Sequence, residues 1–129
     1  MAKLERILHV DDDEDIRTLT KMALELVGKY EVEQFPTGEA ALEHPEAITS
    51  QLFLLDYMMP GMSGEELWHH LREVPGLENV PVVFMTAKSE GAFSERLMEM
   101  GALAVIVKPF EISELSAQIA RIWDQAQAV

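Results

Sequence analysis

The sequence predicts an α/β fold, in which a doubly wound, open parallel sheet is sandwiched between helices. Short apolar segments alternate with amphipathic helical patterns from one end of the chain to the other. Three of these segments, "LFLLD", "VPVVFMT" and "AVIV", are apolar almost throughout, as expected of parallel strands covered on both faces. The length of 129 residues fits one domain. Five successive strand–helix units therefore predict a single sheet with right-handed crossovers.

Five segments are predicted to form the strands of this sheet. They span residues 6–10, 30–35, 52–56, 80–86 and 104–107. Helices are expected at 14–27, at 38–43, after Ser63 as an N-cap, at 90–100, and along the apolar stripe near the C-terminus. That last stripe consists of Ile112, Leu115, Ile119, Ile122 and Trp123. The first helix is expected to bury a stripe made of Ile16, Leu19, Ala23, Leu26 and Val27. Gly28 suits the position after its end.

Composition excludes several classes of function. The formal net charge is −13, so most of the surface would repel a phosphate backbone, and nucleic-acid binding is not expected. The chain has no cysteine, which excludes disulfides and thiolate metal sites and fits a reducing compartment. No apolar run is long enough to span a membrane, and no secretory signal is visible at the N-terminus. A cytoplasmic protein is therefore expected.

Polar residues stand where the predicted strands end. The first strand is followed by Asp11 and Asp12, the third ends in Asp56, the fourth ends in Thr86, and the fifth is followed by Lys108. The carboxyl ends of parallel strands meet at one edge of a sheet, which is where ligands bind in such folds. Adjacent strands lie only about 4.8 Å apart. The sequence therefore predicts one pocket that holds three carboxylates, a hydroxyl and an ammonium group.

The chemistry of this set favours a divalent cation and a phosphoryl group. Three neighbouring carboxylates repel one another, and Mg²⁺ relieves that repulsion while retaining waters and accepting a phosphate ligand. Lys108 would supply a positive charge and Thr86 a hydroxyl donor. Asp56 would then be free to act as a carboxylate nucleophile that forms an aspartyl phosphate. We therefore expect phosphoryl transfer, which depends mainly on positioning and charge neutralisation.

Four motifs, "VDDDEDIR", "LLDYMMPGMSG", "MTA" and "KPF", resemble those of the response-regulator receiver domain of two-component signalling. The resemblance covers nearly the whole chain. It implies a flavodoxin-like (βα)5 fold with strand order 2-1-3-4-5. It also implies that Asp56 accepts a phosphoryl group from phosphohistidine, that the chain switches conformation, and that the chain is not otherwise an enzyme.

The resemblance further assigns roles to single residues. Asp11 and Asp12 would hold Mg²⁺ (or Mn²⁺) together with Asp56 and the main-chain carbonyl of Met58. Thr86 and Lys108 would contact the phosphoryl group, and the peptide bond between Lys108 and Pro109 would be cis. Two consecutive strand residues point to opposite faces. Asp11 and Asp12 can therefore both serve only if the chain is already leaving the strand.

Two features depart from the usual family pattern. Three positions before Lys108 the family usually has an aromatic residue that moves with the neighbouring Thr, whereas here the residue is Val105, which has no ring. Output is therefore expected to run through the loop after Thr86 and the fourth helix, where Phe93 is a candidate substitute ring. Met58 and Lys88 lie two residues beyond Asp56 and Thr86, at positions that tune the lifetime of the phosphoryl group in the family.

The leading hypothesis is a stand-alone phosphoacceptor that occupies residues 1–129 without an output domain. Its partners would be a sensor histidine kinase or histidine phosphotransfer protein and a downstream protein on the face of the fourth helix, fifth strand and fifth helix. Dimerisation is left open. Two alternatives are a small Mg²⁺-dependent phosphatase with an aspartate nucleophile and a pseudo-receiver that binds partners without phosphate. His9, inside the first strand, is given no catalytic role.

Overall fold

The computed structural model describes residues 3–87 and 91–127, and the side chains of residues 3–87 and 94–127. Five parallel strands form one sheet in the order β2-β1-β3-β4-β5, as the resemblance implied. The strands are β1 (Arg6–Val10), β2 (Glu31–Phe35), β3 (Leu52–Asp56), β4 (Val82–Thr86) and β5 (Ala104–Val107). The helices are α1 (Glu14–Met22), the π-helical turn η1 (Ala23–Val27), α2 (Gly38–Ala41), the 3-10 turn η2 (Pro45–Ala47), α3 (Gly64–Arg72), α4 (Gly91–Glu99) and α5 (Ile112–Gln127).

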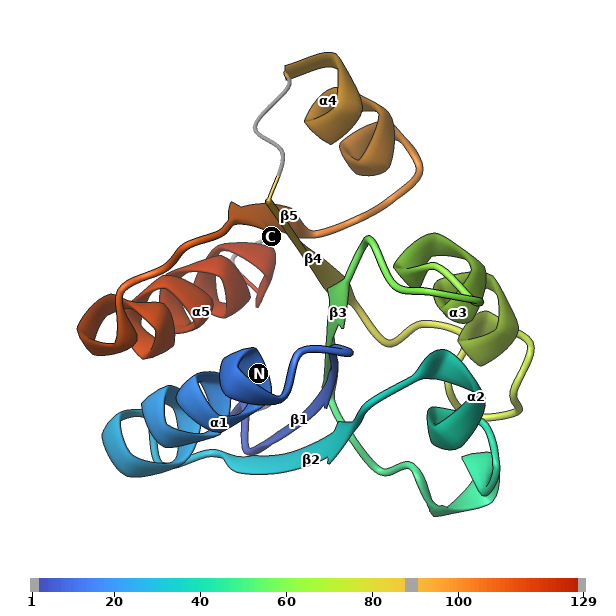
Figure 1. Ribbon diagram of the computed structural model, residues 1–129, viewed down its shortest axis with the longest axis horizontal. Coiled ribbons are helices and arrows are strands. Elements are labelled where there is room, and N and C mark those ends of the chain that lie inside the picture. The colour runs from blue at the N-terminus through green and yellow to red at the C-terminus, as the bar shows by residue number, and fades with distance from the viewer. Residues whose placement is uncertain (1–2, 88–90, 128–129) are drawn as a thin grey trace.

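The sheet separates two apolar cores, one under each layer of helices. Helices α1 and α5 lie on one side of the sheet and α2 and α3 on the other, as Figure 1 shows. The first core joins η1 and α5 to the sheet through Leu24, Leu115 and Ile119. The second joins α3 and α4 through Leu67 and Leu97. Strands β3 and β4 are buried along their whole length, which explains their continuous apolar sequences.

The register of the strands brings their carboxyl ends to one edge of the sheet. Val10, the last residue of β1, pairs with Leu55, and Thr86, the last residue of β4, pairs with Val107. Each of these strands ends at its paired residue or one residue beyond it, so the segments that follow all leave the sheet at the same edge. The predicted meeting of the strand ends therefore holds for β1, β3, β4 and β5.

Four elements are shorter than the sequence predicted. Strand β2 begins at Glu31, β4 begins at Val82, α2 ends at Ala41, and α4 ends at Glu99. Strand β4 starts late because Pro81 has no N–H to donate to a neighbouring strand, although its carbonyl oxygen still accepts from the Phe53 amide at 3.0 Å.

The buried stripe of the first helix differs from the prediction. Leu19, Leu26 and Val27 are exposed, while Leu24, which was not in the predicted stripe, is completely buried. The π-helical turn over Ala23–Val27 accounts for the exposure of Leu26 and Val27, because an i→i+5 turn takes more residues than an α-turn and changes the direction of the residues it contains. Leu19 lies before this turn, so the turn does not account for its exposure.

The end of this helix also differs from the prediction. The residue in the left-handed conformation is Lys29, with φ of 63°, rather than Gly28, with φ of −84°. Gly28 is needed for a different reason. A Cβ there would lie 2.7 Å from the Tyr30 ring and 2.9 Å from the Leu24 carbonyl oxygen.

Two predictions about helices are confirmed. Ser63 is the N-cap of α3 and forms a capping box with Glu66, in which each side chain accepts from the other residue's backbone N–H. Trp123 of α5 is buried in the core between α5 and the sheet. Within residues 3–87 and 91–127, no helix is long and apolar enough to cross a membrane.

Candidate functional site

Three aspartates lie together at the carboxyl edge of the sheet. Asp11, Asp12 and Asp56 each present a carboxylate oxygen, and these oxygens lie within 4.8 Å of one another. Strand β1 ends at Val10. The chain has therefore left the strand where the two consecutive aspartates stand, so both can face the same site. Asp11 and Asp56 are buried, whereas Asp12 is exposed and leaves the cluster open to solvent.

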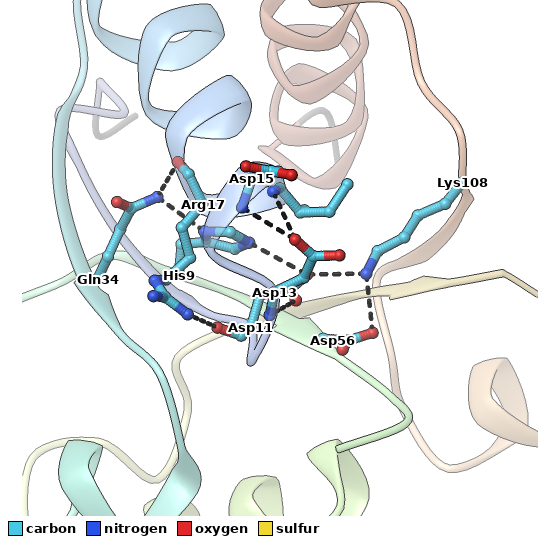
Figure 2. A network of polar contacts seen from close by, with 9 residues as sticks. His9, Asp11, Asp13, Asp15, Arg17, Gln34, Asp56 and Lys108 are labelled. Atoms are coloured by element: carbon cyan, nitrogen blue, oxygen red, sulfur yellow. Dashed lines mark hydrogen bonds and ion pairs between the residues drawn. The ribbon is translucent and has the colours of Figure 1, made fainter. Parts of the chain in front are cut away.

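Lys108 lies between two of these carboxylates. Its Nζ donates to Asp11 Oδ2 at 2.8 Å and to Asp56 Oδ1 at 3.1 Å, as Figure 2 shows. Burial by itself lowers the pKa of the Lys108 ammonium, but the bonds and charges of Asp11 and Asp56 outweigh it and raise that pKa. Lys108 is therefore a fixed positive charge within reach of the oxygens of Asp56.

The carboxyl group of Asp56 has a raised pKa. Burial and the nearby charge of Asp11 raise its pKa from 3.8 to about 7, although Lys108 acts in the opposite direction. Burial and the charge of Asp11 together therefore outweigh the effect of Lys108 on the pKa of Asp56. A carboxylate with unmet negative charge beside it is a site that gains from a cation.

The orientation of Asp11 is fixed by the start of the first helix. Its Oδ1 accepts the Asp13 backbone N–H at 2.9 Å, and its carbonyl oxygen accepts Arg17 Nη1 at 2.7 Å. Asp13 in turn caps α1 by accepting the backbone N–H groups of Asp15 and Ile16. The acidic run after β1 therefore divides into two carboxylates of the cluster, Asp11 and Asp12, and a helix cap, Asp13.

The loop after Asp56 folds back tightly against the site. The Gly64 N–H donates to the Tyr57 carbonyl oxygen at 3.0 Å. A Cβ on Gly64 would overlap the Asp56 carbonyl oxygen, so a larger residue cannot occupy this position without moving the loop. The Ser63 capping box fixes the other side of the same turn.

Thr86 and Met58 lie near this cluster in different settings. Thr86 ends β4 next to Val107, is buried, and accepts the Lys108 backbone N–H on its carbonyl oxygen at 2.7 Å. The Met58 side chain is 60% exposed. The peptide bond between Lys108 and Pro109 is cis.

The residues named for output are only partly covered by the structure. Val105 is half-buried, pairs with Phe84 in the sheet and packs against the core beneath α3 and α4. Lys88 and the side chain of Phe93 lie outside the described part of the chain.

A polar network that was not predicted from the sequence lies behind Asp11. His9 is completely buried in β1, and its Nδ1 lies 2.9 Å from Nε2 of Gln34, its neighbour in β2. The same Gln34 nitrogen donates to the Arg17 carbonyl oxygen at 2.8 Å. Burial, and then the charges of Lys108 and Arg17, lower the pKa of His9 to about 3, so the ring is neutral. Two polar residues, one in the buried strand β1 and one in the partly exposed strand β2, were the available signal, but their contact depends on the register of β1 with β2.

A set of hydrogen bonds that was also not predicted from the sequence links the site to α4. The Tyr57 hydroxyl accepts Arg96 Nη2 at 2.8 Å and donates to Glu65 Oε1 at 3.1 Å. Arg96 Nη2 also lies 2.8 Å from Glu65 Oε1, which closes the triangle. The Tyr57 ring packs edge-on against Phe84, with centroids 5.9 Å apart. The residue after Asp56 is therefore tied to α3, α4 and β4.

The donor set fits a hard divalent cation. Carboxylate oxygens are the ligands that Mg²⁺ prefers, and Asp12 leaves the cluster open to the waters that Mg²⁺ retains. Burial is the main cause of the raised pKa of Asp56 and the charge of Asp11 is the second, and a bound cation would offset the part that comes from Asp11.

A parallel sheet of this order, with an acidic cluster and a lysine at its carboxyl edge, defines a receiver-type signalling domain. The chain belongs to the response regulator receiver domain family, which matches residues 7–120. It is 35% identical over 116 residues to the phosphate regulon transcriptional regulatory protein PhoB of Rhizobium meliloti, covering 90% of this chain and 51% of that protein. The chain therefore spans about half the length of this relative.

Solved structures of receiver proteins share the fold, and two of them serve as examples. The chemotaxis protein CheY4 of Vibrio cholerae superposes with a TM-score of 0.82 at 27% identity, covering 93% of this chain and 99% of that one. A CheY-like receiver domain protein from Methanospirillum hungatei superposes with a TM-score of 0.79 at 31% identity, covering 98% and 100%.

Proposed function

We propose that Asp56 is the phosphoryl acceptor of this domain. The observation that carries the proposal is the position of its carboxylate, 3.1 Å from Lys108 Nζ and inside a cluster with Asp11 and Asp12. An Asp56 oxygen attacks the phosphorus of a phosphohistidine, the new oxygen–phosphorus bond forms, and the phosphorus–nitrogen bond breaks. The released imidazole nitrogen keeps the electron pair and takes up a proton.

The neighbours of Asp56 have separate tasks in this proposal. Lys108 places its ammonium next to the incoming phosphoryl oxygens, and Thr86 supplies a hydroxyl to them. Asp11, Asp12 and Asp56, with the Met58 carbonyl, would hold Mg²⁺. Bound there, the ion would offset charge on the carboxylates and on the phosphoryl oxygens.

The phosphoryl group leaves by hydrolysis. A water oxygen bonds to phosphorus, the bond to the Asp56 oxygen breaks, and the products are the free carboxylate and inorganic phosphate. Met58 is exposed beside the site but carries no hydrogen-bonding side chain that could orient this water. Met58 and Lys88, two residues beyond Asp56 and Thr86 in the sequence, would set how long the phosphoryl group persists.

Two classes of partner follow from the proposal. The donor would be a sensor histidine kinase or a histidine phosphotransfer protein, in keeping with a family whose members act with histidine kinases. The receiver of the signal would be a protein that binds the face of α4, β5 and α5. Val107 supports this face as a docking surface, because it is 42% exposed on β5.

We also infer that α4 reports the state of the site. The ring usual on the fifth strand is absent at Val105, whereas Tyr57 follows Asp56 directly and bonds Arg96 of α4 at 2.8 Å. A movement of the loop after Asp56 would change this bond. Phosphorylation would therefore shift α4 between two arrangements.

Incubation with acetyl phosphate and Mg²⁺ tests the proposed acceptor. Intact-protein mass spectrometry should show the gain of one phosphoryl group in the wild type and none in Asp56→Asn. Asp124→Asn, at an exposed position of α5, is the matched control and should be labelled like the wild type. Repeated turnover of a generic phosphate ester would favour a phosphatase instead. Partner binding without any labelling would favour a phosphate-independent module.

A further inference from the structure

His9 is a buried side chain with one nitrogen that lacks a hydrogen bond. The ring is completely buried at the end of β1, and its Nε2 has no hydrogen-bond partner among the described residues. That nitrogen lies 3.9 Å from Asp11 Oδ2, which is too far for a hydrogen bond. Buried polar groups are normally satisfied, so an unsatisfied one next to a functional carboxylate needs an explanation.

Gln34 determines which nitrogen of His9 carries the proton. The Arg17 carbonyl can only accept, so the Gln34 atom that faces it at 2.8 Å must be the amide nitrogen. The second N–H of that nitrogen points to His9 Nδ1 at 2.9 Å, which makes Nδ1 the acceptor. In a neutral imidazole the proton is then on Nε2, on the side of Asp11. Figure 2 shows this chain of contacts from Gln34 through His9 and Asp11 to Lys108.

The same Asp11 oxygen is the one that Lys108 holds. Lys108 Nζ lies 2.8 Å from Asp11 Oδ2 and 3.1 Å from Asp56 Oδ1, so it serves both carboxylates. A phosphoryl group on Asp56 would bring further negative oxygens close to Lys108 and draw its ammonium towards them. The buried Asp11 oxygen would then lose part of its donor contact at the moment when the site becomes more negative.

We propose that His9 is a positioning residue for Asp11, whose Nε2–H closes on Asp11 Oδ2 when the site carries its phosphoryl group. The inference rests on the proposed role of Asp56. His9 touches neither phosphoryl group nor ion. It acts by keeping the Asp11 carboxylate oriented and hydrogen-bonded while Lys108 moves towards the new charge. The hydrogen bond from Gln34 to Nδ1 keeps the Nε2–H of His9 directed at Asp11 both before and after phosphorylation.

The ring nitrogens of His9 can be observed directly by NMR in the wild type, with beryllofluoride and Mg²⁺ as the probe of the phosphorylated state. We expect the proton on Nε2 before and after the addition. We also expect the Nε2–H resonance to move downfield and its exchange with solvent to slow when beryllofluoride binds. A proton on Nδ1, or an Nε2–H signal unaffected by bound beryllofluoride, would overturn the inference. This measurement needs no variant to fold.

Substitutions give a second, independent readout. His9→Leu removes the donor and should weaken beryllofluoride binding at least fivefold, while Mg²⁺ binding without beryllofluoride changes less than twofold. His9→Gln can place an amide N–H near the position of Nε2 and should recover most of the loss. His44→Leu, at an exposed histidine, is the matched control and should bind like the wild type. Equal beryllofluoride affinity in the wild type and His9→Leu would contradict the role of His9.

The outcomes also separate this inference from the proposed function. If the wild type binds beryllofluoride but His9 is spectroscopically silent and dispensable, Asp56 remains the acceptor and His9 is only a core residue. If the wild type binds no beryllofluoride in the presence of Mg²⁺, the role of Asp56 fails, and the role of His9 fails with it.

Discussion

Arg96 Nη2 of α4 donates a 2.8 Å hydrogen bond to the hydroxyl of Tyr57, the residue that follows Asp56. The two residues are 39 positions apart in the sequence, and their contact joins the site to a helix on the proposed docking face. Glu65 completes the link by bonding both partners. A change in the loop after Asp56 thus has a direct route to α4, in a domain where Val105 cannot provide the usual ring.

Removing this link should uncouple α4 from the site without preventing phosphorylation. In Arg96→Met and Tyr57→Phe, amide chemical-shift changes in α4 on adding beryllofluoride and Mg²⁺ should fall to less than half of the wild-type values. The shift changes around Asp56 should persist, because neither variant removes a site carboxylate or Lys108. Arg121→Met, at an exposed position of α5, is the control. Undiminished shifts in α4 of both variants would show that the signal travels by another route.

The raised pKa of Asp56 predicts a pH dependence of stability in the absence of metal. The unfolded chain releases this proton near pH 4, whereas the folded protein holds it until about pH 7. The folded state binds more protons between these values, so the free energy of unfolding should fall as pH rises through this window. Asp56→Asn should remove the slope and raise the free energy of unfolding at pH 8 by about 1–3 kcal/mol. Urea unfolding at pH 5, 6, 7 and 8 measures both effects, with Asp124→Asn as the control that keeps the slope.

Magnesium should stabilise the domain, and more strongly at high pH. Above the dissociation constant, each tenfold rise in Mg²⁺ should add about 1.4 kcal/mol to the free energy of unfolding at pH 8. The gain should shrink below pH 7, because a proton on Asp56 competes with the ion. Asp12→Asn should raise the Mg²⁺ concentration needed for the same gain in the free energy of unfolding at least tenfold. Asp15→Asn, in the same acidic run but outside the cluster, should leave it intact, and an equal loss in both variants would mean diffuse screening instead of a site.

Gly64 should tolerate no side chain. Gly64→Ala places a methyl group against the Asp56 carbonyl oxygen, and we expect a loss of about 2–4 kcal/mol in the free energy of unfolding. Gly76→Ala is the matched control, because nothing lies within 4 Å of its Cβ position and only its φ of 94° opposes the change. That strain should cost about 1 kcal/mol. Denaturant unfolding of the two variants gives the comparison, and equal losses would argue against close packing at Gly64.

The sequence predicted the fold well because its signals were local. Continuous apolar runs identified β3 and β4. The polar residues at or just after the strand ends, Asp11, Asp12, Asp56 and Lys108, were therefore expected at one edge of the sheet, where they lie. Helix caps such as Ser63 could also be read directly. The π-helical turn could not, because the residues of η1 fit an ordinary helical pattern, and its effect appears only as the exposure of Leu26 and Val27.

The contacts that were missed depend on three-dimensional register. His9 meets Gln34 only because β1 and β2 pair with those residues opposite each other. Tyr57 meets Arg96 only because α4 packs beside α3 over the sheet. Neither pair has a sequence spacing that signals contact. The first pair lies next to Asp11 and the second next to Asp56, which the motifs did identify. The motifs therefore indicate the chemical groups at the sheet edge, whereas the contacts that hold these groups in place appear only in the structure.

The most direct test of the role of Asp56 is chemical mapping of the phosphoryl group. Borohydride reduces an aspartyl phosphate to homoserine and leaves free aspartate unchanged. Trypsin should release residues 30–72 as one peptide, in which Asp56 is the only aspartate. After treatment with acetyl phosphate and Mg²⁺, homoserine should appear at position 56 of this peptide. Homoserine at position 11 or 12 instead, or labelling without any homoserine, would contradict the assignment of Asp56.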